Sequence, residues 1–513
     1  MKTISQAINL KISKIITTSI IILWLLLMVF PFSYLKAQEQ VNRLSLDDVI
    51  YIARQQSPDA LIAKHRFRRS YWEFRRYKAN YLPMLRFDGT IPNINRSIDK
   101  ITLPDGSEIF QERSYVNSQL DLSINQTIGF TGGELFLSSG LQRLDNFTDT
   151  SNIVSYLSTP INIGYRQPIF QYNSFKWDKK IEPLKYEEAE RRYLEDIEQI
   201  SITTTNHFFN LLLAQIEKEI AYKNMHNYDT LYKIAHGRYN LGKIAENELL
   251  QLELNYLKAK ASVENAELDL ENNLFKLKSY LRIKVDYSIE LIPPIETYHF
   301  TVNASIAIQK AKDNTSTALD FEKRMLEAES SVNMAKMENR FDAELFVVFG
   351  LTQTADNIPD TYKNTLDQEQ VSLGIHIPII DWGLAKGSIK MAESSQELIR
   401  TSIEQEKIDF EQNIFLTVMK FDMQENQLMI AAKSDTVAQK RYEITQKRYM
   451  IGKVNDVLEL NNAQIDNDNA KKSYFKTLQT YWQNYYELRK LTLFDFKAGH
   501  RIRFNITDIG YID

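Results

Sequence analysis

The sequence predicts an α+β protein in which β-strands are joined to very long, paired α-helices, and in which this arrangement occurs twice. Three observations support this: an internal repeat at a constant offset, stretches that alternate apolar and polar residues, and apolar residues three and four apart over tens of residues. The chain has 513 residues, 43% of them hydrophobic, with only 16 glycines and 12 prolines. This composition is typical of a large folded protein rather than a disordered one.

The repeat is seen most clearly in a short motif. The sequence RYNLGK begins at Arg238, and RYMIGK begins 210 residues later at Arg448. The same offset relates the strand-ending Gln167-Pro168 to Ile377-Pro378. It also relates four further pairs: Ile200 and Phe410, Thr204 and Ile414, Leu211 and Phe421, Leu281 and Leu491. An offset held without insertion indicates an internal duplication, in which each copy reads as strand end, long helix, glycine turn and second long helix.

Residues 1–37 read as a signal peptide. A positive start precedes the apolar run at residues 15–30, which is short for a membrane-spanning helix. Leu35-Lys36-Ala37 offers a small residue for cleavage, so the mature chain is expected to begin near Gln38. An uncleaved membrane anchor is the alternative interpretation.

Charge and cysteine content exclude several classes of function. The formal net charge is −4, and it becomes −8 once the signal segment and its four lysines are removed. An acidic exported protein is a poor partner for nucleic acid. The chain has no cysteine, which excludes disulfides, thiolate chemistry, cysteine-ligated zinc and lipid attachment through an N-terminal cysteine.

The first repeat is expected to span residues 38–290. It opens with a helix that Ser45 caps and that Ser57-Pro58 interrupts. Strands are expected at about residues 84–167, where three stretches alternate apolar and polar residues: 120–128, 135–141 and 157–165. A long helix pair at about residues 178–284 follows, and its first helix, of about 59 residues, would be roughly 90 Å long.

The second repeat is expected to span residues 291–492, with an opening helix, strands at about 342–378 and a helix pair at about 383–490. The last of these helices carries a more polar stripe than its counterpart, so the two halves are not interchangeable. The first repeat holds about 48 extra residues between its opening helix and Pro168. Residues 493–513 form a C-terminal tail with no clear pattern.

The alternating strands leave two interpretations open. Aliphatic side chains on one face and small polar ones on the other suit a barrel wall between lipid and water. An ordinary half-buried antiparallel sheet in a soluble protein would show the same alternation.

No catalytic motif is present. The seven histidines lack zinc-ligand spacing, and the sequence has no HExxH, GxSxG, GxxxxGK[ST] or GxGxxG motif. We therefore expect no enzymatic activity, no metal and no cofactor.

The glycine turns have a structural and a functional interpretation. Gly242 and Gly452 can adopt the positive φ that ends a helix tightly and lets two helices fold back. The neighbouring basic residues can simply complement the helix C-termini, which is the reading that physical chemistry alone favours. A tip with Arg-Tyr and Gly-Lys in both copies can also dock a partner.

Together, the export signal, the two repeats, the long paired helices and a strand pair in each repeat resemble the TolC-like family of outer-membrane efflux proteins. The resemblance extends from Leu44 to about Thr492, and the duplicated Arg-Tyr-x-x-Gly turns match best. It implies a homotrimer in the outer membrane, in which each chain adds four strands to a shared twelve-stranded β-barrel. The barrel continues as a long α-helical coiled-coil tunnel across the periplasm. The extra residues, with a hairpin at about residues 115–143, depart from that pattern, and they either extend outside the cell or add strands.

The resemblance also implies partners and site residues. A periplasmic adaptor (membrane fusion) protein would dock on the two tips, an inner-membrane transporter would supply energy, and outer-membrane lipid would surround the barrel. The implied docking residues are Arg238, Tyr239, Gly242, Lys243, Arg448, Tyr449, Gly452 and Lys453. Asp456 and Glu459 are candidates for an acidic pore aperture, although an ungapped match places Leu458 and Asn461 at the usual positions.

The function that follows is a passive exit duct of a tripartite efflux or type I secretion system. The alternative is an exported, membrane-anchored coiled-coil scaffold without a pore.

Overall fold

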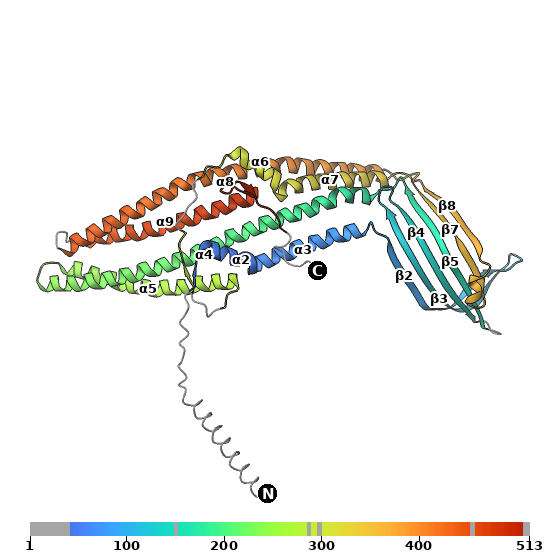
Figure 1. The fold of residues 1–513 in the computed structure, drawn as a ribbon, viewed down its shortest axis with the longest axis horizontal. Helices are drawn as coiled ribbons and strands as arrows, with labels where there is room; N and C mark the ends of the chain where they lie inside the picture. The colour runs from blue at the N-terminus through green and yellow to red at the C-terminus, as the bar shows by residue number, and fades with distance from the viewer. Residues whose placement is uncertain (1–41, 148–151, 285–288, 295–299, 452–456, 506–513) are drawn as a thin grey trace, which may run out of the picture.

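A computed structural model describes residues 42–147, 152–284, 289–294, 300–451 and 457–505. The molecule is elongated, with a β-sheet at one end and the tips of two helical hairpins at the other (Figure 1). The signal segment at residues 1–37, together with Gly452, Lys453 and Asp456, lies outside the described residues. Within the described ranges, no helix combines the length and the apolar character needed to cross a membrane.

One antiparallel sheet of six strands forms the first end of the molecule. Its order is β2-β3-β4-β5-β7-β8. The strands are β2 (Met84–Thr102), β3 (Glu108–Ile128), β4 (Gly133–Phe147), β5 (Asn152–Ile169), β7 (Asp342–Ala355) and β8 (Leu366–His376). A short 3-10 helix, η1 (Pro359–Tyr362), lies between β7 and β8. The first half of the chain thus supplies four strands and the second half two.

The sheet corrects one expectation from the family resemblance, that each chain contributes four strands. The extra residues of the first half add strands, because β2 pairs with β3 and β3 pairs with β4 in one continuous sheet. The strand β2 contains a bulge between Thr90 and Asn93. A bulge of one extra residue moves the apolar side chains from odd to even positions, so β2 lacks a simple alternation along its length.

The helices confirm the predicted combination of strands with very long helices. The two longest are α4 (Ser174–Asn240) and α8 (Leu384–Met450), each of 67 residues. Each folds back into a helix of 36 residues: α5 (Glu246–Leu281) and α9 (Val457–Thr492). Shorter helices are α2 (Leu46–Gln56), α3 (Pro58–Ala79), α6 (Ala304–Asn314) and α7 (Ser316–Glu338).

The long helices of the two halves have equal lengths, and α8 begins 210 residues after α4. The opening helices also correspond, since α2 and α3 meet at Ser57 and α6 and α7 meet at Thr315. Ser45 caps α2 in a capping box with Asp48, as its position before the helix predicts. The division of the chain into two repeats remains a prediction from the sequence.

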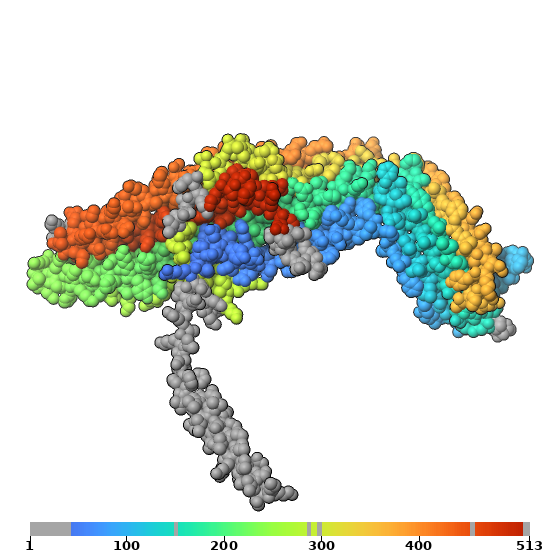
Figure 2. All heavy atoms as spheres, in the orientation of Figure 1, coloured from blue at the N-terminus to red at the C-terminus, as the bar shows by residue number. Residues whose placement is uncertain are grey.

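The core lies between the long helices, about midway between the sheet and the tips. There, α2 and α6 cover α4, α8 and α9, and small parallel strands β1 (Asn42–Leu44) and β6 (Ile289–Leu291) pair beside them. Figure 2 shows that α2, α6 and the C-terminal residues, which include β9 (Phe494–Asp495) and β10 (His500–Arg501), gather around this middle region. The side chains of Phe208, Phe209, Leu211 and Leu277 are fully buried in this core. Packing in this middle region holds the long helices side by side, and it thereby positions both the sheet and the tips.

Candidate functional site

One face of the sheet carries a row of apolar side chains that crosses five of its six strands. Across five neighbouring strands, register partners form an apolar row of Leu85, Ile124, Leu137, Ile163 and Phe349. These side chains are 38–66% exposed. A sheet face that exposes a continuous apolar row is unfavourable in water and favourable against lipid.

On the opposite face, the neighbouring row of these strands is polar or small, whereas Phe136, Phe346 and Val348 lie further along that face. The row next to the apolar one consists of Arg86, Ser123, Ser138, Asn162 and Gly350. Because neighbouring residues in a strand point to opposite faces, the register separates the two kinds of side chain completely in these rows. The sheet therefore has the two-sided character of a wall between lipid and water.

At the far end of the molecule, the first hairpin tip closes tightly around Gly242. This residue has φ +63°, and its N–H donates to the Tyr239 carbonyl at 2.8 Å. The Lys243 N–H donates to the Arg238 carbonyl at 2.9 Å. These two bonds form a Schellman motif, which satisfies the last carbonyls of α4 and turns the chain into α5.

Arg238 joins the first hairpin to the second. Its Nη2 atom donates to the carbonyl oxygens of Tyr449 at 3.1 Å and Met450 at 3.2 Å. Its guanidinium also lies 5.2 Å from the centre of the Tyr449 ring. Tyr449 is only 1% exposed, and burial raises the pKa of its hydroxyl. The contact combines charged hydrogen bonds with a cation–π interaction, so it holds the two tips together.

The equivalent residues of the two tips therefore differ in environment. Arg448 is exposed, whereas Arg238 is half-buried. Tyr239 is 39% exposed, whereas Tyr449 is buried. Of the predicted docking residues that the structure describes, Tyr239, Gly242, Lys243 and Arg448 are exposed. Arg238 and Tyr449 connect the hairpins instead of facing outward.

The aperture candidates in the described part of the chain lie in the first turns of α9. Leu458 is 65% exposed, and Glu459 is half-buried. Asn461 accepts a hydrogen bond from the Tyr228 hydroxyl of α4 at 2.7 Å. Asn461 therefore contributes to the contact between the two hairpins.

A polar seam, defined here as the α4–α9 contact around Asn224, Tyr228, Asn461 and Asp468, continues from this point. Asn224 Nδ2 donates to Asp468 Oδ2 at 2.6 Å. Burial raises the pKa of the Asp468 carboxyl, and it raises the pKa of the Tyr228 hydroxyl to about 12. The sequence analysis named Asn461 as an aperture position but missed Asn224, Tyr228 and Asp468. The more polar stripe of the last helix was the signal that could have pointed to this seam.

The raised pKa of Asp468 makes the seam sensitive to pH. The protonated carboxyl fits the seam better than the carboxylate, because desolvation penalises the charge. The stability that Asp468 contributes is therefore complete below its ordinary pKa of 3.8 and is lost as the pH rises through the raised value.

We expect Asp468→Asn to raise the unfolding temperature of the helical region at pH 7 by roughly 1–2 °C, because the amide accepts the same hydrogen bond without a charge. Thermal unfolding followed by circular dichroism between pH 3 and pH 7 measures this, and the difference from the parent protein should shrink toward pH 3. Asp466→Asn is the matched control, since Asp466 is 54% exposed and pairs with Arg441. A lower unfolding temperature for Asp468→Asn at pH 7 would contradict the assignment.

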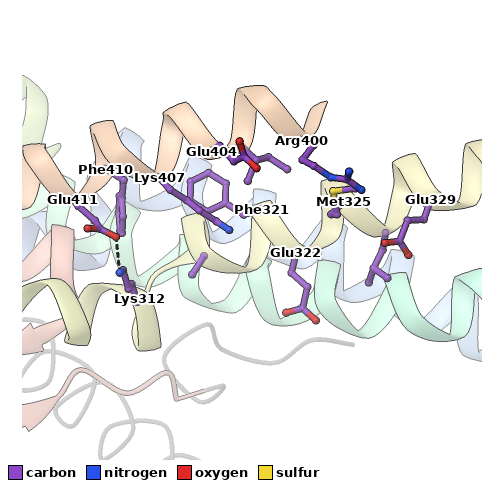
Figure 3. Close-up of a pocket in the computed structure, with 13 residues that line it drawn as sticks. Lys312, Phe321, Glu322, Met325, Glu329, Arg400, Glu404, Lys407, Phe410 and Glu411 are labelled. Atoms are coloured by element: carbon purple, nitrogen blue, oxygen red, sulfur yellow. Dashed lines mark ion pairs between the residues drawn. The ribbon is translucent and has the colours of Figure 1, made fainter. Parts of the chain in front are cut away.

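A groove of about 740 Å³ lies between α7 and α8 (Figure 3). Its apolar lining includes Phe321, Ile403 and Phe410, and charged side chains of both signs surround it. Lys312 and Glu411 form an ion pair of 2.5 Å at one end. In the described ranges, no group of three or more His, Asp or Glu side chains is placed to hold a metal ion.

Comparison with known proteins finds a matching sequence family for part of the chain. Residues 347–492 match the sequence family described as outer membrane efflux protein. A search of curated protein sequences gives no match.

The fold is similar to those of solved outer-membrane channels. The CmeC outer membrane channel of Campylobacter jejuni superposes with a TM-score of 0.63 at 15% identity, covering 90% of this chain and 87% of CmeC. The outer membrane protein VceC of Vibrio cholerae gives 0.60 at 12% identity, covering 89% and 97%. The open state of the MtrE outer membrane channel of Neisseria gonorrhoeae gives 0.51 at 14% identity, covering 89% and 90%.

The chain therefore has the fold of TolC-like outer-membrane channels over nearly its whole described length. Residues 347–492 match the outer membrane efflux protein family, which agrees with the family resemblance read from the sequence.

Proposed function

We propose that this protein is the outer-membrane exit duct of a tripartite efflux or type I secretion system. The observation that carries the proposal is the two-faced sheet, whose strands lead directly into helices that extend far beyond it. In three copies, such sheets would form a barrel in the outer membrane, and the helices would form a tunnel that reaches into the periplasm. The fold relatives and the efflux domain support this reading.

The duct is passive in this proposal. An inner-membrane transporter supplies the energy, and a periplasmic adaptor protein docks on the exposed tip residues Tyr239, Lys243 and Arg448. Outer-membrane lipid contacts the apolar sheet face, and nucleic acid has no part. The protein is not an enzyme.

Opening of the duct is proposed to be an iris-like movement of the hairpin tips. Contacts between the two hairpins of one chain set the closed state. Besides the Arg238 bridge and the polar seam, they include the ion pairs Lys472–Glu217 at 3.1 Å and Lys471–Glu219 at 3.5 Å. These pairs join α9 to α4, so they must shift if the second hairpin moves against the first.

Planar-bilayer conductance of the purified mature protein, measured alongside its mass in detergent, tests the proposal. We expect a trimer mass and small single channels that favour cations, with Asp456 and Glu459 as the next residues to replace. A monomer without conductance would contradict the duct and support the membrane-anchored scaffold.

Gly452→Pro should also abolish export in cells, and unchanged export would count against docking at the tips.

A further inference from the structure

The two outer edges of the sheet are the strands β2 and β8. Among the described strands, none pairs with the free side of β2 or of β8. The free edges are long, since β2 has 19 residues and β8 has 11. In a lipid environment each unpaired backbone group costs several kcal/mol, so these edges need strands to pair with.

The two edges are complementary in direction and in face. The strand β2 follows α3 and runs away from the helices, whereas β8 runs toward the helices and leads into α8. They would therefore pair antiparallel, like every other pair in this sheet. Leu85 and Phe87 of β2 lie on the apolar face, and so do Leu373 and Ile375 of β8.

We propose that β8 of one copy pairs with β2 of the next, so that three copies close an eighteen-stranded barrel. The inference rests on the proposed function, in which three copies form one duct. It differs from the twelve strands that the family resemblance implies, because each copy brings six strands. Since barrel diameter grows roughly in proportion to strand number, the barrel would be about 1.5 times as wide.

The helical hairpins have unpartnered edges on the same two sides. Contacts place the helices near the tips in the order α5-α4-α9-α8, so α5 and α8 are the outer helices. An exposed apolar stripe runs along α8 and onto its C-cap residue at intervals of seven residues: Leu416, Met423, Ile430, Val437, Ile444 and Ile451, each 45–66% exposed. Exposed apolar side chains also follow α5 at intervals typical of a coiled-coil seam: Leu250, Leu254, Leu257, Leu268 and Phe275, each 45–72% exposed.

The two stripes lie at similar distances from the tips, on helices that run in opposite directions. The helix α8 runs toward the tips and α5 runs away from them, so the two would pack antiparallel. The stripe on each helix begins at its tip and continues toward the core. Pairing of β8 with β2 brings α8 of one copy to the α5 side of the next, so sheet and helices belong to one interface.

Charges on the two stripes are also complementary. Glu264 interrupts the stripe of α5, and Lys433 lies on the stripe of α8; both are exposed. Glu264 is 18 residues from the start of α5, and Lys433 is 17 residues from the end of α8. At equal distances from the tips, these two side chains would meet across the interface between copies.

The absence of cysteine makes the strand pairing directly testable by disulfide cross-linking in outer membranes. Phe87→Cys is combined in turn with Val371→Cys, Leu373→Cys or Ile375→Cys. These three residues occupy every second position of β8 on its apolar face, so the three combinations test three possible registers of the β8–β2 pair. We expect one combination to give covalently linked trimers on a non-reducing gel. Leu137→Cys with Leu373→Cys is the matched control, and it should not link copies.

The outcomes separate this inference from the proposed function. A conducting trimer in which only the Leu137–Leu373 combination links copies would overturn the eighteen-stranded barrel, since β4 would then be an edge and each copy would contribute four strands. A conducting trimer that none of the combinations links would also overturn it. A monomer without conductance would overturn the proposed function itself.

A charge exchange tests the helical half of the interface. We expect Glu264→Lys and Lys433→Glu each to lower the temperature at which trimers dissociate in mild detergent, and the double variant to restore it. Asp269→Lys, an exposed position on another side of α5, should leave that temperature unchanged. Additive losses in the double variant would overturn the pairing of α5 with α8.

Discussion

Replacing Glu198 by alanine is expected to destabilise the folded chain by about 3–5 kcal/mol. Glu198 is only 1% exposed and accepts from Arg489 through two atoms, Nε at 2.9 Å and Nη2 at 3.1 Å. It also pairs with Arg54 at 2.9 Å. Alanine would remove the carboxylate that both guanidinium groups share, so that Arg489 would keep Asp495 as its acidic partner and Arg54 would keep the Ser201 hydroxyl. Removing one partner of a buried ion pair is among the most costly changes in a protein.

Urea unfolding of the detergent-solubilised protein, followed by circular dichroism, measures this loss. Glu219→Ala is the matched control on the same helix, since the Glu219 side chain is 68% exposed and its pair with Lys471 is 3.5 Å long. That pair should contribute between 0 and about 1 kcal/mol. Equal effects of the two substitutions would show that the buried network does not stabilise the middle of the molecule.

Replacing Arg238 by glutamate is expected to loosen the closed tips and to raise single-channel conductance or open probability about tenfold. The guanidinium makes two hydrogen bonds to carbonyl oxygens of the second hairpin and covers the Tyr449 ring. A carboxylate would instead repel those oxygens. A charged hydrogen bond contributes about 1.5–3 kcal/mol, and 1.4 kcal/mol changes an equilibrium tenfold.

Arg448→Glu is the matched control, because Arg448 occupies the equivalent position in the second tip and is exposed. We expect this variant to conduct like the parent protein in a bilayer. If Arg448 docks the adaptor, the same variant should reduce export in cells. If the Arg238→Glu variant conducts like the parent protein, the contact of Arg238 with the second hairpin does not control opening.

The sequence was most informative where a pattern is sustained. Apolar spacings of three and four over tens of residues predicted helix pairs at about 178–284 and 383–490, close to the observed α4–α5 and α8–α9. Long helices show this pattern in their sequence because one face stays buried along their whole length. The N-cap at Ser45 and the break at Ser57 were predicted because their signals are local.

The number of strands could not be predicted in the same way. The bulge in β2 exchanges the faces of its apolar residues, so the alternation that reveals a strand is interrupted near Pro92. The contact of Arg238 with the second hairpin also could not be predicted from the sequence. The two Arg-Tyr motifs look equivalent, and only the packing of one hairpin against the other buries Tyr449 while leaving Tyr239 exposed.

The six strands also bear on how sheet and helices can share one wall. Strands about 4.8 Å apart and tilted by about 40° each occupy roughly 6 Å of a barrel's perimeter, so six of them span about 37 Å. Next to the sheet, the helices are ordered α3-α4-α7-α8, and four helices at about 8–10 Å span roughly 32–40 Å. Four strands would span only about 25 Å. With six strands per copy, the estimated width of the strands falls within that of the helices, so a wall closed by three copies, as proposed above, would pass from strand to helix without a constriction.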